Sequence, residues 1–247
     1  MDNISIDYSK FPSHVGIIMD GNGRWAIKNN KDRNYGHLKG AETAEKVIEW
    51  SKNFGIKYLT LYTFSEENWK RPKEEIEFLF DLLVRYFESN YVKMTQNGVK
   101  VRFLGRINKL PPKVSQACLK TEQMTQEANN INLIMAMNYS GRQEIVDAVN
   151  KIIKEGKKEI TIKDIEKNLY LPDVPYPDLI IRTAGEKRLS NFLLWESAYS
   201  EFYFTDVLWP DFTYEEYLLS LLDYSKRERR FGGIPIHNPN DGVTPFE

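Results

Sequence analysis

Apolar residues in this chain occur in short continuous runs, which are separated by longer stretches with helical spacing. Five runs are rich in β-branched and aromatic residues and are bounded by turn-forming residues, as buried strands are. They occupy residues 15–19, 56–64, 99–105, 131–139 and 177–182, and the last of these strands ends at Arg182. Because successive positions are apolar, both faces of each predicted strand are expected to be covered.

Helices are predicted between these strands because apolar residues recur there every three to four positions. In residues 37–55, a single stripe carries Leu38, Ala41, Ala44, Val47 and Ile48. The other predicted helices span about residues 74–94, 112–128, 141–156, 161–170 and 213–230. Strands that alternate with helices predict an α/β fold in which helices flank a mostly parallel sheet.

Polar clusters follow three of the predicted strands at the point where each strand ends. They span residues 20–24, 65–69 and 182–186. Ligands of open parallel sheets bind beyond the carboxyl ends of the strands. The three clusters are therefore expected to lie together on one rim of the sheet.

Length and composition predict a single domain without a membrane segment. The chain has 247 residues, of which 41% are hydrophobic, and a net charge of −1, so nothing overall attracts it to nucleic acid or anionic lipid. We expect one domain over residues 1–247, with a core at about 13–234 and flexible tails at 1–12 and 235–247. A lone Cys118 and the lack of a signal segment or a long apolar run predict a soluble cytoplasmic protein.

The first polar cluster combines groups that suit a metal-bridged phosphate. Arg24 and the backbone of a Gly-rich turn favour an anion. Asp20 fits such a site when Mg²⁺ lies between the carboxylate and the phosphate. A plain tight turn explains the glycines equally well, and neither a GxxxxGK[ST] nor a GxGxxG motif occurs. Arg33, His37 and Lys39 follow closely and favour phosphate contact.

The third cluster predicts a second anion site. Arg182, Lys187, Arg188 and Ser190 bring three cations and a hydroxyl into nine residues after a buried strand. A solvated charged loop is the alternative interpretation, but the strand is expected to aim Arg182 at the rim. The basic segment at residues 227–233 fits cations at a helix C-terminus.

Apolar features indicate where the rest of a phosphorylated substrate lies. The helix over residues 76–87 is apolar nearly all round, which fits either complete burial or one face lining a channel for a lipid-sized chain. Phe78, Phe80, Leu83 and Phe87 are candidate wall residues. An aromatic segment at residues 191–212 fits a dimer face, and Glu201 within it is a candidate second ligand for the cation near Asp20.

Taken together, these motifs resemble one family. The segments HVGIIMDGNGRWA, YGHLKGAE, LTLYTFSEENWKRP, DLIIRTAGEKRLSNFLLWESAYSEFYFTDVLWPDF and RERRFGG are similar, in this order, to those of cis-prenyltransferases, above all bacterial undecaprenyl diphosphate synthases. The resemblance covers about residues 13–234. The paired DDxxD motifs of trans-prenyltransferases are absent from the sequence.

The resemblance implies a fold and an activity. It implies a six-stranded sheet flanked by helices, with an apolar tunnel for a growing chain, in a homodimer. It also implies a Mg²⁺-dependent condensation of farnesyl diphosphate with successive isopentenyl diphosphates, which makes a cis double bond at each step. The implied product is long-chain undecaprenyl diphosphate, a carrier of cell-wall precursors, and the implied membrane contact is at most peripheral.

The resemblance also implies residue roles. Asp20 and Asn68 would be catalytic, Asn68 as proton acceptor, and Asp20 and Glu201 would bind Mg²⁺. The allylic diphosphate would contact Gly21, Asn22, Gly23, Arg24, Trp25, Arg33 and His37. The loop over the site would contain Ser65, Glu66, Glu67, Trp69 and Arg71. The isopentenyl diphosphate would contact Arg182, Lys187, Arg188, Leu189 and Ser190. A tail motif would include Arg230, Gly232 and Gly233.

Two departures from the family pattern and three alternative functions accompany this interpretation. Lys187 stands where relatives often have His, and Ala184 where they often have Gly or Ser. One alternative is a non-catalytic subunit of a two-component cis-prenyltransferase, which would lack the motif acid and arginines. Another is a synthase with a shorter product. A nucleic-acid-binding module is disfavoured by the near-neutral charge.

Overall fold

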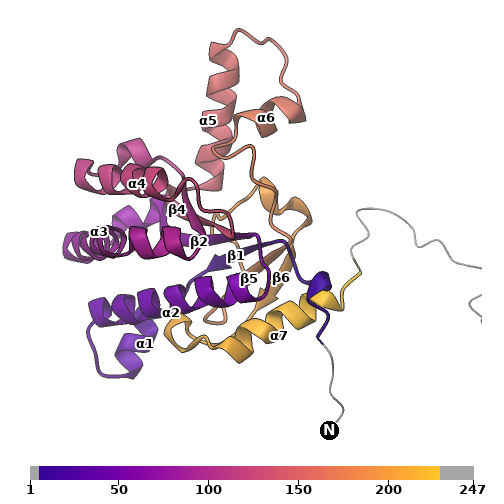
Figure 1. Cartoon of the computed structure of the whole chain (residues 1–247). Coiled ribbons are helices and arrows are strands. Elements are labelled where there is room, and N and C mark those ends of the chain that lie inside the picture. The colour runs from indigo at the N-terminus through magenta and orange to yellow at the C-terminus, as the bar shows by residue number, and fades with distance from the viewer. Residues whose placement is uncertain (1–5, 229–247) are drawn as a thin grey trace, which may run out of the picture.

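The computed structural model describes residues 6–228, and its centre is a sheet of six parallel strands (Figure 1). The order across the sheet is β3-β4-β2-β1-β5-β6. The strands are β1 (His14–Ile18), β2 (Tyr58–Ser65), β3 (Val99–Leu104), β4 (Ile131–Tyr139), β5 (Leu179–Arg182) and β6 (Glu201–Phe204). The prediction of a mostly parallel α/β sheet is confirmed, since every neighbouring pair is parallel.

Seven helices lie around the sheet in the described part of the chain (Figure 1). They are α1 (Asn22–Lys28), α2 (Arg33–Asn53), α3 (Lys73–Gln96), α4 (Pro112–Thr125), α5 (Gly141–Lys154), α6 (Ile162–Asn168) and α7 (Tyr214–Ser225). Local signals set several ends. The side chains of Asp32 and Thr213 cap the first turns of α2 and α7. Gly55, with φ of 80°, follows the end of α2.

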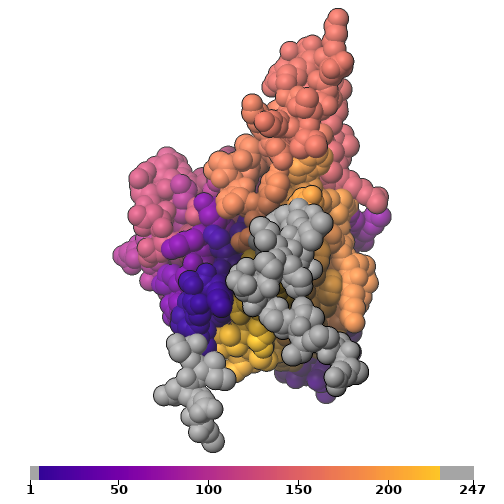
Figure 2. All heavy atoms as spheres, turned by 90° about the vertical axis from the view of Figure 1, so that its right-hand side faces the viewer, coloured from indigo at the N-terminus to yellow at the C-terminus, as the bar shows by residue number. Residues whose placement is uncertain are grey.

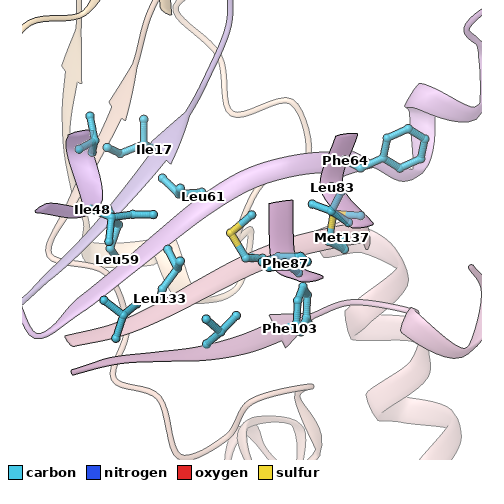
Figure 3. Packing of buried hydrophobic residues seen from close by; sticks show 14 of the residues in the cluster. Ile17, Ile48, Leu59, Leu61, Phe64, Leu83, Phe87, Phe103, Leu133 and Met137 are labelled. Carbon is cyan, nitrogen blue, oxygen red and sulfur yellow. The ribbon is translucent and has the colours of Figure 1, made fainter. Parts of the chain in front are cut away.

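The two faces of the sheet carry separate apolar clusters. On one face, Ile17, Leu61 and Leu133 pack under Ile48 of α2 and Phe87 of α3 (Figure 3). The other face is covered by residues 170–174 and 189–193, which follow α6 and β5. Each fully buried Leu, Ile or Phe stabilises the fold by about 1.5–3 kcal/mol, so the sheet is a rigid base for whatever lies at its ends.

The segment with α5 and α6 extends beyond the rest of the domain, as both overall views show (Figures 1 and 2). Within residues 6–228, every helix is too short or too polar to cross a lipid bilayer. The predicted tail motif at Arg230, Gly232 and Gly233 lies outside the described residues, as does most of the predicted tail at 235–247 and part of that at 1–12.

Two elements, α1 and β6, were not predicted from the pattern of apolar residues. The seven-residue α1 buries only Ala26, so it has no apolar stripe to recognise. The four-residue β6 lies at the sheet edge and is partly exposed, and its aromatic residues suggested a surface rather than a strand. The final helix also ends earlier than predicted, at Ser225. Finally, α3 is buried on one side only, because Glu77 and Arg85 face solvent.

Candidate active site

A cleft of about 820 Å³ lies at the carboxyl ends of the strands. Residues from all three predicted polar clusters line it, together with groups from α2 and α5. Its walls are formed by Ile18, Met19, Asp20, Gly21, Asn22, Gly23, Arg24, Arg33, His37, Tyr62, Thr63, Ser65, Glu67, Asn68, Arg71, Arg142, Arg182, Leu189, Ser190, Asn191 and Leu194. The expected convergence on one rim therefore exists in the fold.

An ion pair joins the first and third clusters. The Asp20 Oδ2 atom accepts from Arg182 Nη2 at 2.9 Å, and its Oδ1 accepts from the Gly21 N–H at 3.0 Å. Gly21 has φ of 113°, a conformation that a side chain disfavours. The Arg182 guanidinium is buried, and Nη1 also donates to Ser190 Oγ at 2.8 Å and to the Arg188 carbonyl. One guanidinium thus spans from Asp20 to the loop of Arg188.

Close packing of α1 against α2 sets the position of Asn22. A Cβ atom on Gly36 would lie 2.2 Å from the Asn22 carbonyl oxygen, and one on Gly40 would lie 2.4 Å from Asn22 Oδ1. Only glycine leaves room for this approach. This packing holds Asn22 in the lining of the cleft, directly after Asp20 and Gly21.

A single buried carboxylate, Glu75, binds two arginines and a histidine that line the cleft. Glu75 accepts from Arg33 Nε at 3.0 Å, from His37 Nε2 at 3.0 Å and from Arg71 Nη1 at 3.3 Å. Burial alone would raise the pKa of Glu75, but hydrogen bonds from Arg33 and His37 and the charge of Arg71 bring the pKa below its ordinary value. Burial also lowers the pKa of His37, so its neutral ring donates to the carboxylate at neutral pH.

The segment after β2 forms a short 3₁₀ helix, η2 (Glu66–Lys70), beside the cleft. Asn68 caps this helix, since its Oδ1 accepts from the Ser65 N–H at 3.0 Å. Trp69 Nε1 donates to Asn138 Oδ1 at 2.7 Å, and Glu66 lies 3.6 Å from Arg106. The second cluster is therefore fixed against β3 and β4 while Ser65, Glu67 and Asn68 line the cleft.

An apolar cavity of about 120 Å³ adjoins the cleft. Met19, Asn22, His37 and Thr63 line both spaces. On α3, the cavity is lined by Leu79, Leu82, Leu83 and Tyr86. Of the four predicted wall residues, only Leu83 lines it.

The other three wall predictions were wrong, because helix geometry presents a different face of α3 to the cavity. Phe80 and Phe87 pack in the main core instead, and Phe78 does not line the cavity. Residues 79, 82, 83 and 86 follow helical spacing along the cavity face.

Comparisons with known proteins decide the family. Residues 18–232 match the sequence model of the prenyltransferase family described as undecaprenyl diphosphate synthase. The chain is 55% identical over 229 residues to the isoprenyl transferase of Thermotoga maritima, which covers 91% of this chain and 98% of the relative. The chain belongs to this prenyltransferase family. A second relative, the isoprenyl transferase of Fusobacterium nucleatum, is 50% identical over 223 residues, covering 90% and 96% of the two chains.

Solved structures of the family share the fold. Lavandulyl diphosphate synthase from Lavandula x intermedia, solved with dimethylallyl diphosphate, superposes with a TM-score of 0.87 at 34% identity and covers 91% of this chain and 99% of its own. A probable undecaprenyl diphosphate synthase from Campylobacter jejuni gives a TM-score of 0.77 at 34% identity, with 90% and 98% covered. The predicted cis-prenyltransferase fold is thereby confirmed.

In this prenyltransferase, several predicted site residues lie outside the lining of the cleft. Arg24 does line the cleft, and its guanidinium also pairs with Glu186 at 3.5 Å. Its neighbour in sequence does not. Trp25 instead donates to Asp211 at 2.6 Å and stacks on Tyr35. Glu66, Trp69, Lys187 and Arg188 also lie outside the lining, and the last three are exposed.

The predicted metal pair of Asp20 and Glu201 does not exist within one chain. Glu201 begins β6 opposite Leu179, at the amino end of β5, whereas Asp20 lies past the carboxyl ends. Glu201 instead accepts from Arg227 Nη1 at 2.8 Å. Because the strands are parallel, Glu201 lies at their amino ends and Asp20 at their carboxyl ends. This corrects the prediction of a metal site shared by the two acids.

The cleft nevertheless fits Mg²⁺ in one specific mode. Among residues 6–228, no group of three or more His, Cys, Asp or Glu side chains could hold a metal ion. Mg²⁺ commonly binds through one or two carboxylates plus substrate phosphates. The Asp20 carboxylate, which is 37% exposed in a cleft lined by arginines, meets that requirement when a diphosphate completes the coordination.

Sequence reasoning missed three groups of the site. Glu75 looked like an ordinary acid in the first turn of α3, yet it is 7% exposed and accepts hydrogen bonds from two arginines and a histidine. Arg142 and Asn191 line the cleft from α5 and from the loop after Ser190. The acid in a helical first turn was the one signal in the sequence, but nothing local linked it to Arg33, which lies 42 positions away.

A buried acid pair lies behind the second anion loop. Burial raises the pKa of Glu144, and burial and then the charge of Glu144 raise the pKa of Glu196 to about 9. Tyr139 donates to Glu144 at 2.6 Å. Glu196 is therefore protonated at neutral pH.

Proposed function

We propose that this chain condenses an allylic diphosphate, farnesyl diphosphate, with successive isopentenyl diphosphates, in a Mg²⁺-dependent reaction that yields a long-chain Z-polyprenyl diphosphate. The observation that carries the proposal is the continuity between the cationic cleft and the apolar cavity at Asn22 and His37. A substrate with a charged head and a hydrocarbon tail matches this junction.

The two diphosphates would bind in different parts of the cleft. His37 lines both the cleft and the apolar cavity, and Arg33 and Arg71 share Glu75 with it, so the allylic diphosphate belongs beside these three with its tail inward. Arg182, Arg188 and the Ser190 hydroxyl are joined on the other side of Asp20 and would hold the isopentenyl diphosphate. This division orients the alkene of one substrate toward the allylic carbon of the other.

Departure of the allylic diphosphate requires stabilisation of developing negative charge. When bound at Asp20, Mg²⁺ supplies this stabilisation as a Lewis acid. The Arg24 guanidinium and the backbone N–H groups at the start of α1 add donors from the same wall. The apolar cavity residues keep water from the allylic cation.

The final step is loss of a proton. Asn68 lines the cleft and is the residue that the family resemblance proposes as acceptor. Its Oδ1 already accepts from the Ser65 backbone, and a neutral carboxamide is a weak base. In our proposal Asn68 and Asn22 hold a water molecule that takes up the proton and passes it on. The departing diphosphate is the final acceptor of that proton.

Product length depends on the apolar cavity. Its volume of about 120 Å³ is close to that of a cavity that binds benzene, about 150 Å³. A long chain therefore requires α2 and α3 to separate. The family model and the Campylobacter jejuni structure, both described as undecaprenyl diphosphate synthase, support the long product. A shorter Z-prenyl product is the second candidate, which the small cavity favours.

We further propose a homodimer through the β6 edge. Among residues 6–228, β6 is an edge strand of the sheet, and both its Phe204 and the preceding Tyr199 are exposed. An open edge with exposed aromatic residues favours association with a second copy. No nucleic acid enters this scheme, and any membrane contact would be peripheral, to release the lipid product.

The test is chain-length analysis of product made by the purified chain. The enzyme receives farnesyl diphosphate, labelled isopentenyl diphosphate and Mg²⁺, and the products are dephosphorylated and measured by mass. We expect long-chain Z-polyprenols, and at least a hundredfold lower turnover for Asp20→Ala, because the carboxylate that would hold Mg²⁺ against the leaving diphosphate is removed.

Asp81→Ala, at an exposed acid on α3, is the control and should keep full turnover. A chain that makes no product, or an Asp20→Ala variant with near-normal turnover, contradicts the proposal. The first outcome would favour the non-catalytic subunit. Products of only four or five isoprene units, one or two more than the farnesyl primer, would replace the long-chain product with the shorter one.

A further inference from the structure

Asn191 lies where three parts of the candidate site meet. It directly follows Ser190, whose hydroxyl accepts from Arg182. Its backbone has φ of 68°, a left-handed conformation that Asn tolerates better than most residues. Its carbonyl oxygen accepts from the N–H of Gly141 at 2.8 Å, which fixes the loop against the first residue of α5.

The side-chain amide of Asn191 is fully used. Nδ2 donates to Glu67 Oε1 at 2.8 Å and to Ser140 Oγ at 3.0 Å. Oδ1 accepts from the backbone N–H of Arg142 at 3.4 Å. One side chain thus joins η2, the end of β4 and the start of α5 to the loop of the second anion position.

The contact with Glu67 differs from the other contacts of η2. Glu66 and Trp69 bind Arg106 and Asn138, which belong to the β3 and β4 side of the sheet. The Glu67–Asn191 hydrogen bond instead joins two residues that both line the cleft, one in η2 and one in the loop after Ser190. It therefore connects η2 directly to the residues that would hold the second diphosphate.

We propose that Asn191 is a positioning residue that couples occupancy of the second anion position to the position of η2 over the cleft. This inference rests on the proposed function. A diphosphate held by Arg182, Arg188 and Ser190 fixes the loop, and Asn191, one residue further, then holds Glu67. Glu67 in turn keeps the neighbouring Asn68 at the cleft, so the second substrate completes the site that acts on it.

The substitution Asn191→Asp isolates this coupling from folding. Aspartate has nearly the same shape and can still accept from the Arg142 N–H and from the Ser140 hydroxyl. It cannot donate to Glu67, and it places a like charge beside that carboxylate. Since hydrogen bonds to charged groups are the stronger ones, kcat/KM for isopentenyl diphosphate should fall about tenfold, with little change in KM for the allylic substrate.

Reversing donor and acceptor is the decisive comparison. In Asn191→Asp with Glu67→Gln, the new amide can donate to the new carboxylate, so the hydrogen bond is restored in the opposite direction. We expect the double variant to have a higher kcat/KM than Asn191→Asp alone, which gives a non-additive cycle. Ser140→Ala, which removes the other amide contact without touching η2, is the matched control and should not change kcat/KM.

Limited trypsin digestion provides a readout without turnover. The exposed Lys70 lies in η2, whereas Arg71 precedes Pro72 and resists cleavage. Isopentenyl diphosphate should slow cleavage after Lys70 in the original chain but not in Asn191→Asp. Additive kinetics together with equal protection in both proteins would overturn the inference, whereas absence of any product from the original chain would overturn the proposed function instead.

Discussion

Glu75 offers the sharpest test of how the cleft is built. The substitution Glu75→Gln keeps the shape of the side chain but removes the charge that Arg33, His37 and Arg71 share. The hydrogen bond to His37 is buried on both sides, so it is worth about 1.5–3 kcal/mol. The two arginine side chains are 55% and 33% exposed, which limits each of those ion pairs to about 0–1 kcal/mol.

These contributions give about 2 kcal/mol for Glu75→Gln, since glutamine retains one acceptor oxygen. For a chain of this size the melting temperature should fall by about 4–8 °C. The pKa of Glu75 is below its ordinary value of 4.5, so its contribution is present above pH 4.5 and is lost as the pH falls through the lower, folded-state pKa. The difference between the two proteins should therefore shrink in acid.

The assay combines thermal unfolding by circular dichroism with steady-state kinetics. Glu77→Gln, at an exposed acid on the other side of α3, is the matched control. We expect KM for the allylic diphosphate to rise about tenfold in Glu75→Gln, because its three contacts lose their common anchor. Equal melting temperatures and equal KM values for the Glu75 and Glu77 variants would refute the reasoning.

Two further predictions concern the second anion loop and the acid pair behind it. Arg188→Ala should raise KM for isopentenyl diphosphate more than KM for the allylic substrate, as initial rates will show; equal effects would mean that the two anion positions are exchanged. Because the pKa of Glu196 is raised to about 9, folding takes up a proton between pH 4.5 and 9 and stability falls as the pH rises. Urea unfolding at pH 6 and pH 8.5 should show a smaller loss for Glu196→Gln than for the original chain, and identical losses would contradict the protonated state.

Much of this architecture could be predicted from local patterns. The strand predicted over residues 131–139 has the same bounds as β4. Each of the other four predicted strands begins and ends within two residues of the observed strand. Because all strands run the same way, Asp20, Ser65 and Arg182 had to reach one edge of the sheet. The order of motifs then predicted the family.

The partners of those residues depended on the tertiary structure. No local pattern links Glu75 to Arg33 and His37, since they come from different helices. The face of α3 that lines the cavity is likewise set by how α2 and α3 pack. Glu201 was misplaced because β6 was not recognised as a parallel strand. Without that strand, the sequence could not show that Glu201 lies at the amino ends of the strands.

The sequence by itself determined the alternation of strands and helices, the three polar clusters and the family, because each of these is written in neighbouring residues. Only the tertiary structure decided which charges meet, which helix face lines the cavity and that Asn191 connects η2 to the second anion loop. The physical reason is that contacts between distant segments depend on how the whole core packs, and no short stretch of sequence contains that information.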